Sequence, residues 1–212
     1  MTFVFDRLTR PVRLLLAVLL MGLVPAAAHA AKWYVDNTLG EVKPEEKVLP
    51  KNPKPLQVIY EFQRDGAAHA RATKETRGYA LAALTGTGAF ASVAETPVAE
   101  GAVLKIRFNN VVKKEEMDKA KKDGFRAGLG FGLFGGVVAT DYYVVTLEYV
   151  AAPGAAPIVT TVNHALHMKF GKKDVEIPGT EVKGVKLAVE TVVRQALARG
   201  VNNIVADPAF PQ

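Results

Sequence analysis

The chain has 212 residues, contains no cysteine and carries a formal net charge of +6. The absence of cysteine excludes disulfides, thiol nucleophiles and thiolate metal sites. Its basic residues alternate with Glu and Asp instead of gathering among aromatic residues, which argues against a nucleic-acid-binding protein.

The first thirty residues have the three parts of a secretion signal. Arginines open the segment, an apolar run of eleven residues follows from Leu14 to Val24, and small residues lead to Ala28 and Ala30. Eleven apolar residues are too few to cross a membrane, which takes about 20. We therefore expect cleavage after Ala30 and release into a bacterial periplasm without a lipid anchor, as a mature chain with a net charge of +4.

The segment that follows the signal differs in composition from the rest of the chain. Residues 31–39 can form a short strand or an extended arm, and residues 40–55 hold four prolines among lysines and glutamates. Because proline fixes φ and removes a backbone donor, we expect residues 40–55 to be an extended linker or an arm along the surface. The predicted organisation is a signal peptide at 1–30, a Pro/Lys-rich arm at 31–55 and a folded domain at 56–212.

The folded domain alternates between strand-like and helix-like patterns. Alternating apolar residues predict strands at 56–62, 90–94, 103–112, 141–150 and 158–170, the last two joined by a hairpin at 151–154. Helical spacing predicts helices at 72–84 and 185–197, which end near Gly86 and Gly200. Because hairpins outnumber long crossovers, we expect an α/β two-layer sandwich: a mainly antiparallel sheet of about five strands with two helices on one face.

No catalytic group is evident in the sequence. Ser92 is the only serine, and it lies in a predicted strand without the flanking glycines of a nucleophile elbow. His164 and His167 are three residues apart in a predicted strand, so they point to opposite faces and cannot share a metal ion, while His69 is expected at the surface. The acidic residues outside the charge runs cannot be paired from the sequence; they are Asp141, Glu148, Glu190 and Asp207. We therefore predict a protein that is not an enzyme and has no cofactor or metal.

Two glycine-rich stretches need separate interpretation. Residues 85–88 follow a helix and lack the Gly-Lys-Ser/Thr end of a phosphate loop, so we interpret them as a turn. Within an insertion at 113–138, glycine recurs every fourth residue from Gly124 to Gly136 among Leu, Phe and Val. This stretch fits a loop or the start of a strand, a helix that binds a partner, or an element that touches a membrane. The predicted contact residues are Gly128, Leu129, Phe131, Gly132, Leu133, Phe134 and Gly136.

Several of these features occur together in one group of proteins. A helix ends at Leu84, a Gly-x-Phe strand start follows at residues 88–90, and a long strand, a Gly-Leu-Phe loop and a tyrosine-rich strand come next. This order resembles uncharacterised periplasmic proteins of Gram-negative bacteria. More distantly, it resembles the auxiliary lipoproteins of ABC transport, the lipoproteins that activate penicillin-binding proteins, and the N-terminal domain of TolB. Those families act by binding proteins, so the resemblance implies no catalytic residues, and this chain lacks their lipid-bearing cysteine.

The expected function is that of a non-enzymatic accessory or adaptor protein of the bacterial cell envelope, which binds a protein partner and no nucleic acid. The alternative is an envelope protein that contacts an anionic membrane surface through residues 124–138. A third reading is an enzyme whose carboxylates are distant in the sequence. The sequence predicts no oligomeric state.

Overall fold

The computed structural model describes residues 31–113, 115, 137–170 and 174–211. The strands are β1 (Lys32–Asp36), β2 (Pro55–Arg64), β3 (Ala67–Ala68), β4 (Ser92–Ala94), β5 (Ala102–Val111), β6 (Val137–Val150), β7 (Ile158–Phe170) and β8 (Gly179–Val182). The helices of these described residues are α1 (Ala70–Thr87) and α3 (Val185–Ala206), and a 3-10 turn, η2, lies at Pro44–Glu46. Among the described residues, no helix is both long enough and apolar enough to cross a membrane.

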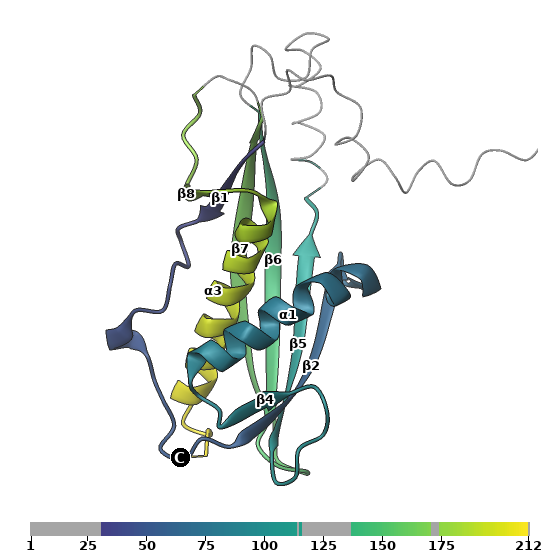
Figure 1. Ribbon diagram of the computed structural model, residues 1–212, viewed down its shortest axis with the longest axis vertical. Helices are drawn as coiled ribbons and strands as arrows, with labels where there is room; N and C mark the ends of the chain where they lie inside the picture. The colour runs from purple at the N-terminus through teal and green to yellow at the C-terminus, as the bar shows by residue number, and fades with distance from the viewer. Residues whose placement is uncertain (1–30, 114, 116–136, 171–173, 212) are drawn as a thin grey trace, which may run out of the picture. The chain divides into compact units, whose positions relative to one another are not determined.

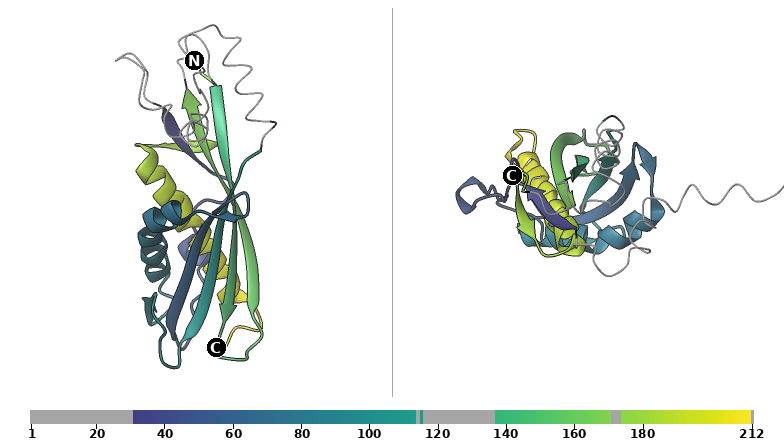
Figure 2. Two further views of the ribbon diagram at one scale, coloured as in Figure 1. Left: turned by 90° about the vertical axis from the view of Figure 1, so that its right-hand side faces the viewer. Right: turned by 90° about the horizontal axis from the view of Figure 1, so that it is seen from above.

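All strands belong to one open sheet, and both helices cover the same face of it (Figures 1 and 2). The strand order is β3-β2-β5-β6-β7-β1-β8, with β4 beside β2. β5, β6 and β7 are antiparallel neighbours, whereas β2 and β5 run parallel, with Leu56 opposite Ala102. The parallel pair arises because α1 returns the chain to the starting end of β2 before β5 begins. The α/β class is confirmed, but the sheet has eight strands, not five, and is mixed, not mainly antiparallel.

β1 is an inner strand of this sheet. It pairs antiparallel with β7 on one side and with β8 on the other, so that Val35 lies between Leu166 and Thr180. Val35 is 3% exposed. Residues 32–36 are therefore part of the sheet, and only residues 37–54, called the arm from here on, run outside it between β1 and β2.

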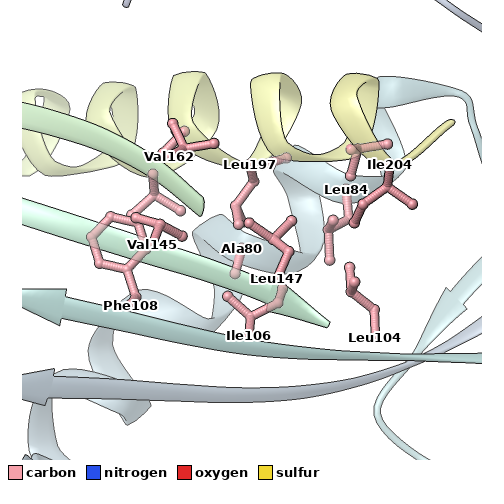
Figure 3. Packing of buried hydrophobic residues seen from close by; sticks show 14 of the residues in the cluster. Ala80, Leu84, Leu104, Ile106, Phe108, Val145, Leu147, Val162, Leu197 and Ile204 are labelled. Carbon is pink, nitrogen blue, oxygen red and sulfur yellow. The ribbon is translucent and has the colours of Figure 1, made fainter. Parts of the chain in front are cut away.

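The core lies between the sheet and the helices (Figure 3). Because side chains alternate along a strand, every second residue of β5 and β6 faces the helices; these include Leu104, Ile106, Phe108, Val145 and Leu147. Ala80 and Leu84 of α1 and Leu197 of α3 pack against them and are completely buried. Each large aliphatic side chain buried in this way contributes about 1.5–3 kcal/mol.

Both helices extend further along the chain than the sequence predicts. α1 continues through Gly86 and stops only at Gly88, whose φ of +67° is left-handed, so residues 85–87 are helical and not a turn. α3 passes through Gly200 and ends at Ala206. At Gly200, an added Cβ would lie 2.6 Å from Cδ1 of Leu147, so glycine serves the close approach of α3 to β6.

Candidate functional site

The seven contact residues predicted from the glycine repeat lie outside the described residues, and so does most of the insertion at 113–138. Its flanks are described. β5 ends at Val111, and β6 begins at Val137, which pairs with Phe170 at the end of β7. The insertion therefore leaves and re-enters the sheet at the end where Phe170 lies.

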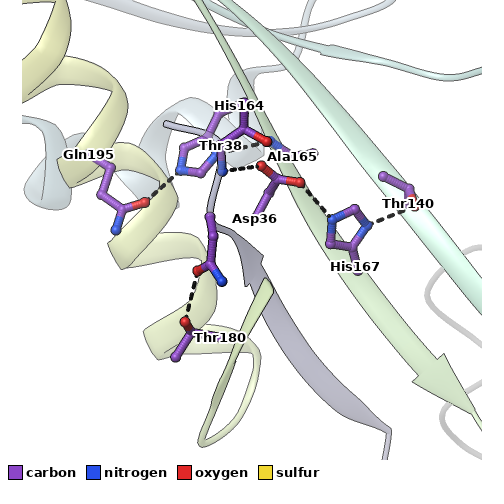
Figure 4. Close-up of polar contacts among 9 residues, drawn as sticks. Asp36, Thr38, Thr140, His164, Ala165, His167, Thr180 and Gln195 are labelled. Atoms are coloured by element: carbon purple, nitrogen blue, oxygen red, sulfur yellow. Dashed lines mark hydrogen bonds and ion pairs between the residues drawn. The ribbon is translucent and has the colours of Figure 1, made fainter. Parts of the chain in front are cut away.

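The two histidines of β7 point to opposite faces of the sheet, as their odd spacing predicts (Figure 4). His164 faces the helices. Its Nδ1 accepts the N–H of Ala165 at 2.9 Å, so the proton is on Nε2, which donates to Oε1 of Gln195 at 2.8 Å. Nε2 of Gln195 then donates to Oε1 of Glu41 at 2.8 Å. This series of hydrogen bonds links the sheet, α3 and the arm.

Burial governs the protonation of His164. The side chain is almost fully enclosed, and this loss of solvation lowers the pKa of His164, although the hydrogen bond with Gln195 and the charges of Asp36 and Glu41 oppose the shift. His164 is therefore stabilised in its neutral form, the form that both of its hydrogen bonds require.

His167 lies on the other face, between an acid and a hydroxyl. Its Nε2 is 3.1 Å from Oδ2 of Asp36, and its Nδ1 is 3.0 Å from Oγ1 of Thr140. An Asp-His-hydroxyl series can activate a nucleophile. Here the side chains of His167 and Asp36 are only 8% and 13% exposed, and the three residues come from paired strands or their ends. We interpret the series as structural, because it joins β1 to the β6–β7 hairpin and leaves little room for a substrate.

Asp36 is also held from its other side. Its Oδ1 accepts the N–H of Thr38 at 2.7 Å. Burial alone would raise the pKa of Asp36, but the hydrogen bonds from Thr38 and His167 outweigh burial and lower that pKa overall. Asp36 is therefore an anion that fixes the turn from β1 into the arm.

The other residues selected from the sequence do not come together. Ser92 lies in β4, and His69 caps α1 by accepting the N–H of Ala72 at 3.1 Å. The four carboxylates are dispersed. Asp141 lies in β6, where burial raises its pKa, and Glu148 pairs with Lys105. Asp207 accepts the N–H of Ala209 after α3, and Glu190 lines the groove described next. The described residues contain no group of three metal-ligating side chains.

A groove of about 270 Å³ lies between α1, α3 and the arm. Small or apolar residues make up much of its wall: Ala82 and Gly86 of α1, Ala198 and Val201 of α3, and Val42 and Val48 of the arm. Lys47, Glu190 and Arg194 add charge. Pockets for whole cofactors or drug-sized ligands measure about 300–1,000 Å³. This groove lies at the lower end of that range, a volume that one or two side chains of another protein can also fill.

Side chains of α3 hold the arm over the groove. Asn202 accepts the N–H of Val48 at 2.7 Å through Oδ1 and donates to the carbonyl of Glu46 at 3.0 Å through Nδ2. Arg199 lies 3.0 Å from the carboxylate of Glu46, and Arg194 pairs with Glu41. Sequence reasoning missed these residues. The available signal was the four-residue spacing of Arg194, Ala198 and Asn202, which places them on one side of a helix.

Comparisons with known proteins add little to this site. No family model matches the chain, and no curated protein sequence matches it. Among the solved structures that are similar to the chain, one described as an uncharacterized protein has 13% sequence identity and a TM-score of 0.30, and the match covers 75% of this chain and 93% of that one. Function must therefore be inferred from the side chains of the chain itself.

Proposed function

We propose that the chain is a non-enzymatic accessory protein of the bacterial periplasm and binds a protein partner in the groove between α1 and α3. The groove carries this proposal, because it is hollow, mostly small or apolar in lining, and of a size that takes protein side chains. The periplasmic location rests on the secretion signal in residues 1–30.

The polar surroundings of the groove also suit a protein partner. An interface commonly has an apolar centre and a charged, solvent-accessible rim. Lys47 and Glu190 supply charges of both signs beside the apolar residues. The arm that forms one wall is held partly by exposed ion pairs, which contribute only about 0–1 kcal/mol each, so this wall can adjust to a partner at low cost.

Filling the groove tests the proposal. Ala82 is exposed and lines the groove, so Ala82→Trp should occupy it without disturbing the core, whereas Ala91→Trp places the same side chain on exposed surface elsewhere. A photoreactive residue at Leu49, which is 52% exposed, would report a partner in envelope preparations. We expect a discrete crosslinked protein that Ala82→Trp abolishes and Ala91→Trp retains. An unchanged crosslink in a folded Ala82→Trp protein would refute the proposal.

Contact with an anionic membrane is a second candidate, favoured by one observation. Four large apolar residues are between 37% and 46% exposed near the end of the sheet where the insertion leaves it: Phe170, Val175, Val185 and Leu187. Lys183 and Lys186 flank two of them. Exposed apolar side chains among lysines are typical of surfaces that bind anionic lipid.

Vesicle flotation tests this second candidate. The mature protein should float with vesicles that contain anionic phospholipid and less with neutral ones, and Val185→Asp together with Leu187→Asp should abolish flotation. Ile59→Asp is a matched control, since Ile59 is 48% exposed in β2, away from this end. Equal recovery of the double variant and the control would exclude this surface.

A further inference from the structure

We propose that a segment of the partner replaces residues 41–48 of the arm as one wall of the groove, and that it carries two acidic residues five positions apart followed by a bulky apolar side chain that fills the groove. The inference rests on the proposed function and specifies the partner's chemistry. It starts from contacts already made within the chain, because the arm, which makes one 3-10 turn at Pro44–Glu46, already presents such a segment to α3.

Asn202 recognises the main chain of this segment. One side-chain amide accepts the N–H of Val48 and donates to the carbonyl of Glu46, and Lys47 between them has extended dihedrals, φ −73° and ψ 120°. Both contacts go to backbone groups, so they are independent of the side chains that the segment carries. Any segment with the same backbone conformation at these three residues can make them.

Two arginines of α3 provide selectivity for acidic residues. Arg194 pairs with Glu41, whose carboxylate also accepts a hydrogen bond from Gln195 at 2.8 Å. Arg199 pairs with Glu46 at 3.0 Å. The arginines are partly exposed, so the pairs select partners more than they add affinity. They predict a segment with two acidic residues about five positions apart.

The apolar positions of the arm leave the groove unfilled. Val42 and Val48 lie on its wall, yet about 270 Å³ remains open. A tethered segment competes at an effective concentration on the order of millimolar, so a partner must bind better than the arm does. A Leu or Phe side chain in place of Val48 would supply that advantage by filling the space with apolar atoms.

A labelled peptide is the direct probe. Its sequence is that of residues 38–50 with Val48→Phe, and its anisotropy is measured against the mature chain. Glu41→Ala with Glu46→Ala in the protein removes the arm's own ion pairs and frees the groove. We expect this loosened protein to bind the peptide at least tenfold more tightly than the wild type, and Asn202→Ala in the same background to reverse the gain. A peptide with the residues equivalent to Glu41 and Glu46 replaced by lysine is the control.

The outcomes separate this inference from the proposed function. Absence of binding to a folded loosened protein, or equal binding of the lysine peptide, overturns the acidic segment as the ligand. The proposed function then still stands if Ala82→Trp abolishes the crosslink. If the peptide binds as expected but Ala82→Trp leaves the crosslink intact, the recognition chemistry holds and the protein partner must lie elsewhere. Thermal unfolding of every variant shows whether it is folded.

Discussion

Asp36 and His167 join the first strand of the domain to its longest hairpin, with Oδ2 of Asp36 3.1 Å from Nε2 of His167. Asp36 stands at the end of β1, where the arm begins, and His167 lies in β7 opposite Tyr34. Because both side chains are largely buried, this contact fixes the position of the residue at which the arm begins.

Asp36→Asn tests the contribution of this contact. The folded-state pKa of Asp36 is lowered, so its carboxylate stabilises the fold above pH 3.8, and this stability is lost as the pH falls through the folded value. We expect the substitution to reduce the free energy of unfolding at pH 7 by about 1–3 kcal/mol. Urea unfolding at several pH values should also show a shallower loss of stability in acid. If the variant lost stability below pH 3.8 as steeply as the wild type, the Asp36 carboxylate would not be the group that stabilises the fold there.

His164 predicts a second pH dependence. Its folded-state pKa lies below 6.5, so the unfolded chain binds a proton more readily than the folded protein in that range. Stability is therefore complete above pH 6.5 and declines as the pH falls toward the folded value. His164→Gln removes the titration while retaining an amide that can contact Gln195. We expect lower stability at pH 8, by about 1–2 kcal/mol, and a flatter profile below pH 6.5. An unchanged slope would show that another group titrates there.

Local patterns predicted the centre of the fold well. The β6–β7 hairpin follows from two β-branched runs around a Pro-Gly turn, and α1 and α3 follow from apolar residues at helical spacing. The parallel pairing of β2 with β5 could not be predicted in this way. It depends on the path of α1 across the sheet, which the alternation within either strand does not encode.

Long-range pairing also determines the site. β1 (32–36) and β8 (179–182) are short strands. β1 pairs with β7, and β8 pairs with the other side of β1, so the position of each depends on residues that are distant in the sequence. The groove exists because the arm then returns over α3, where Asn202 and Arg199 hold it. None of these residues belongs to a local motif, so the sequence predicted a surface arm and could not identify what it covers.

Gly200 and Gly78 form a matched pair in the two helices. A Cβ at Gly200 would meet Leu147 at 2.6, 2.8 and 3.2 Å, whereas a Cβ at Gly78 would have no neighbour within 4 Å. Gly200→Ala should therefore overpack the core and cost about 1–3 kcal/mol. Gly78→Ala should stabilise α1 by about 0.5–1 kcal/mol. Thermal or urea unfolding measures both, and equal effects of the two substitutions would contradict the close approach of α3 to β6.

Asn202→Ala should release the arm without unfolding the domain. Trypsin cleaves after lysine except before proline, so Lys47–Val48 and Lys51–Asn52 are the cleavable lysine bonds in the arm. Only the first lies within the segment that Asn202 holds. We expect Asn202→Ala to speed cleavage after Lys47 about fivefold, equivalent to about 1 kcal/mol for the lost hydrogen bonds, with little change after Lys51.

Asn203→Ala is the matched control, because Asn203 contacts Thr160 instead of the arm. If Asn202→Ala and Asn203→Ala are cleaved at the same rate after Lys47, the arm is held by its ion pairs and not by hydrogen bonds to its backbone. Asn202 is then not the residue that recognises the segment.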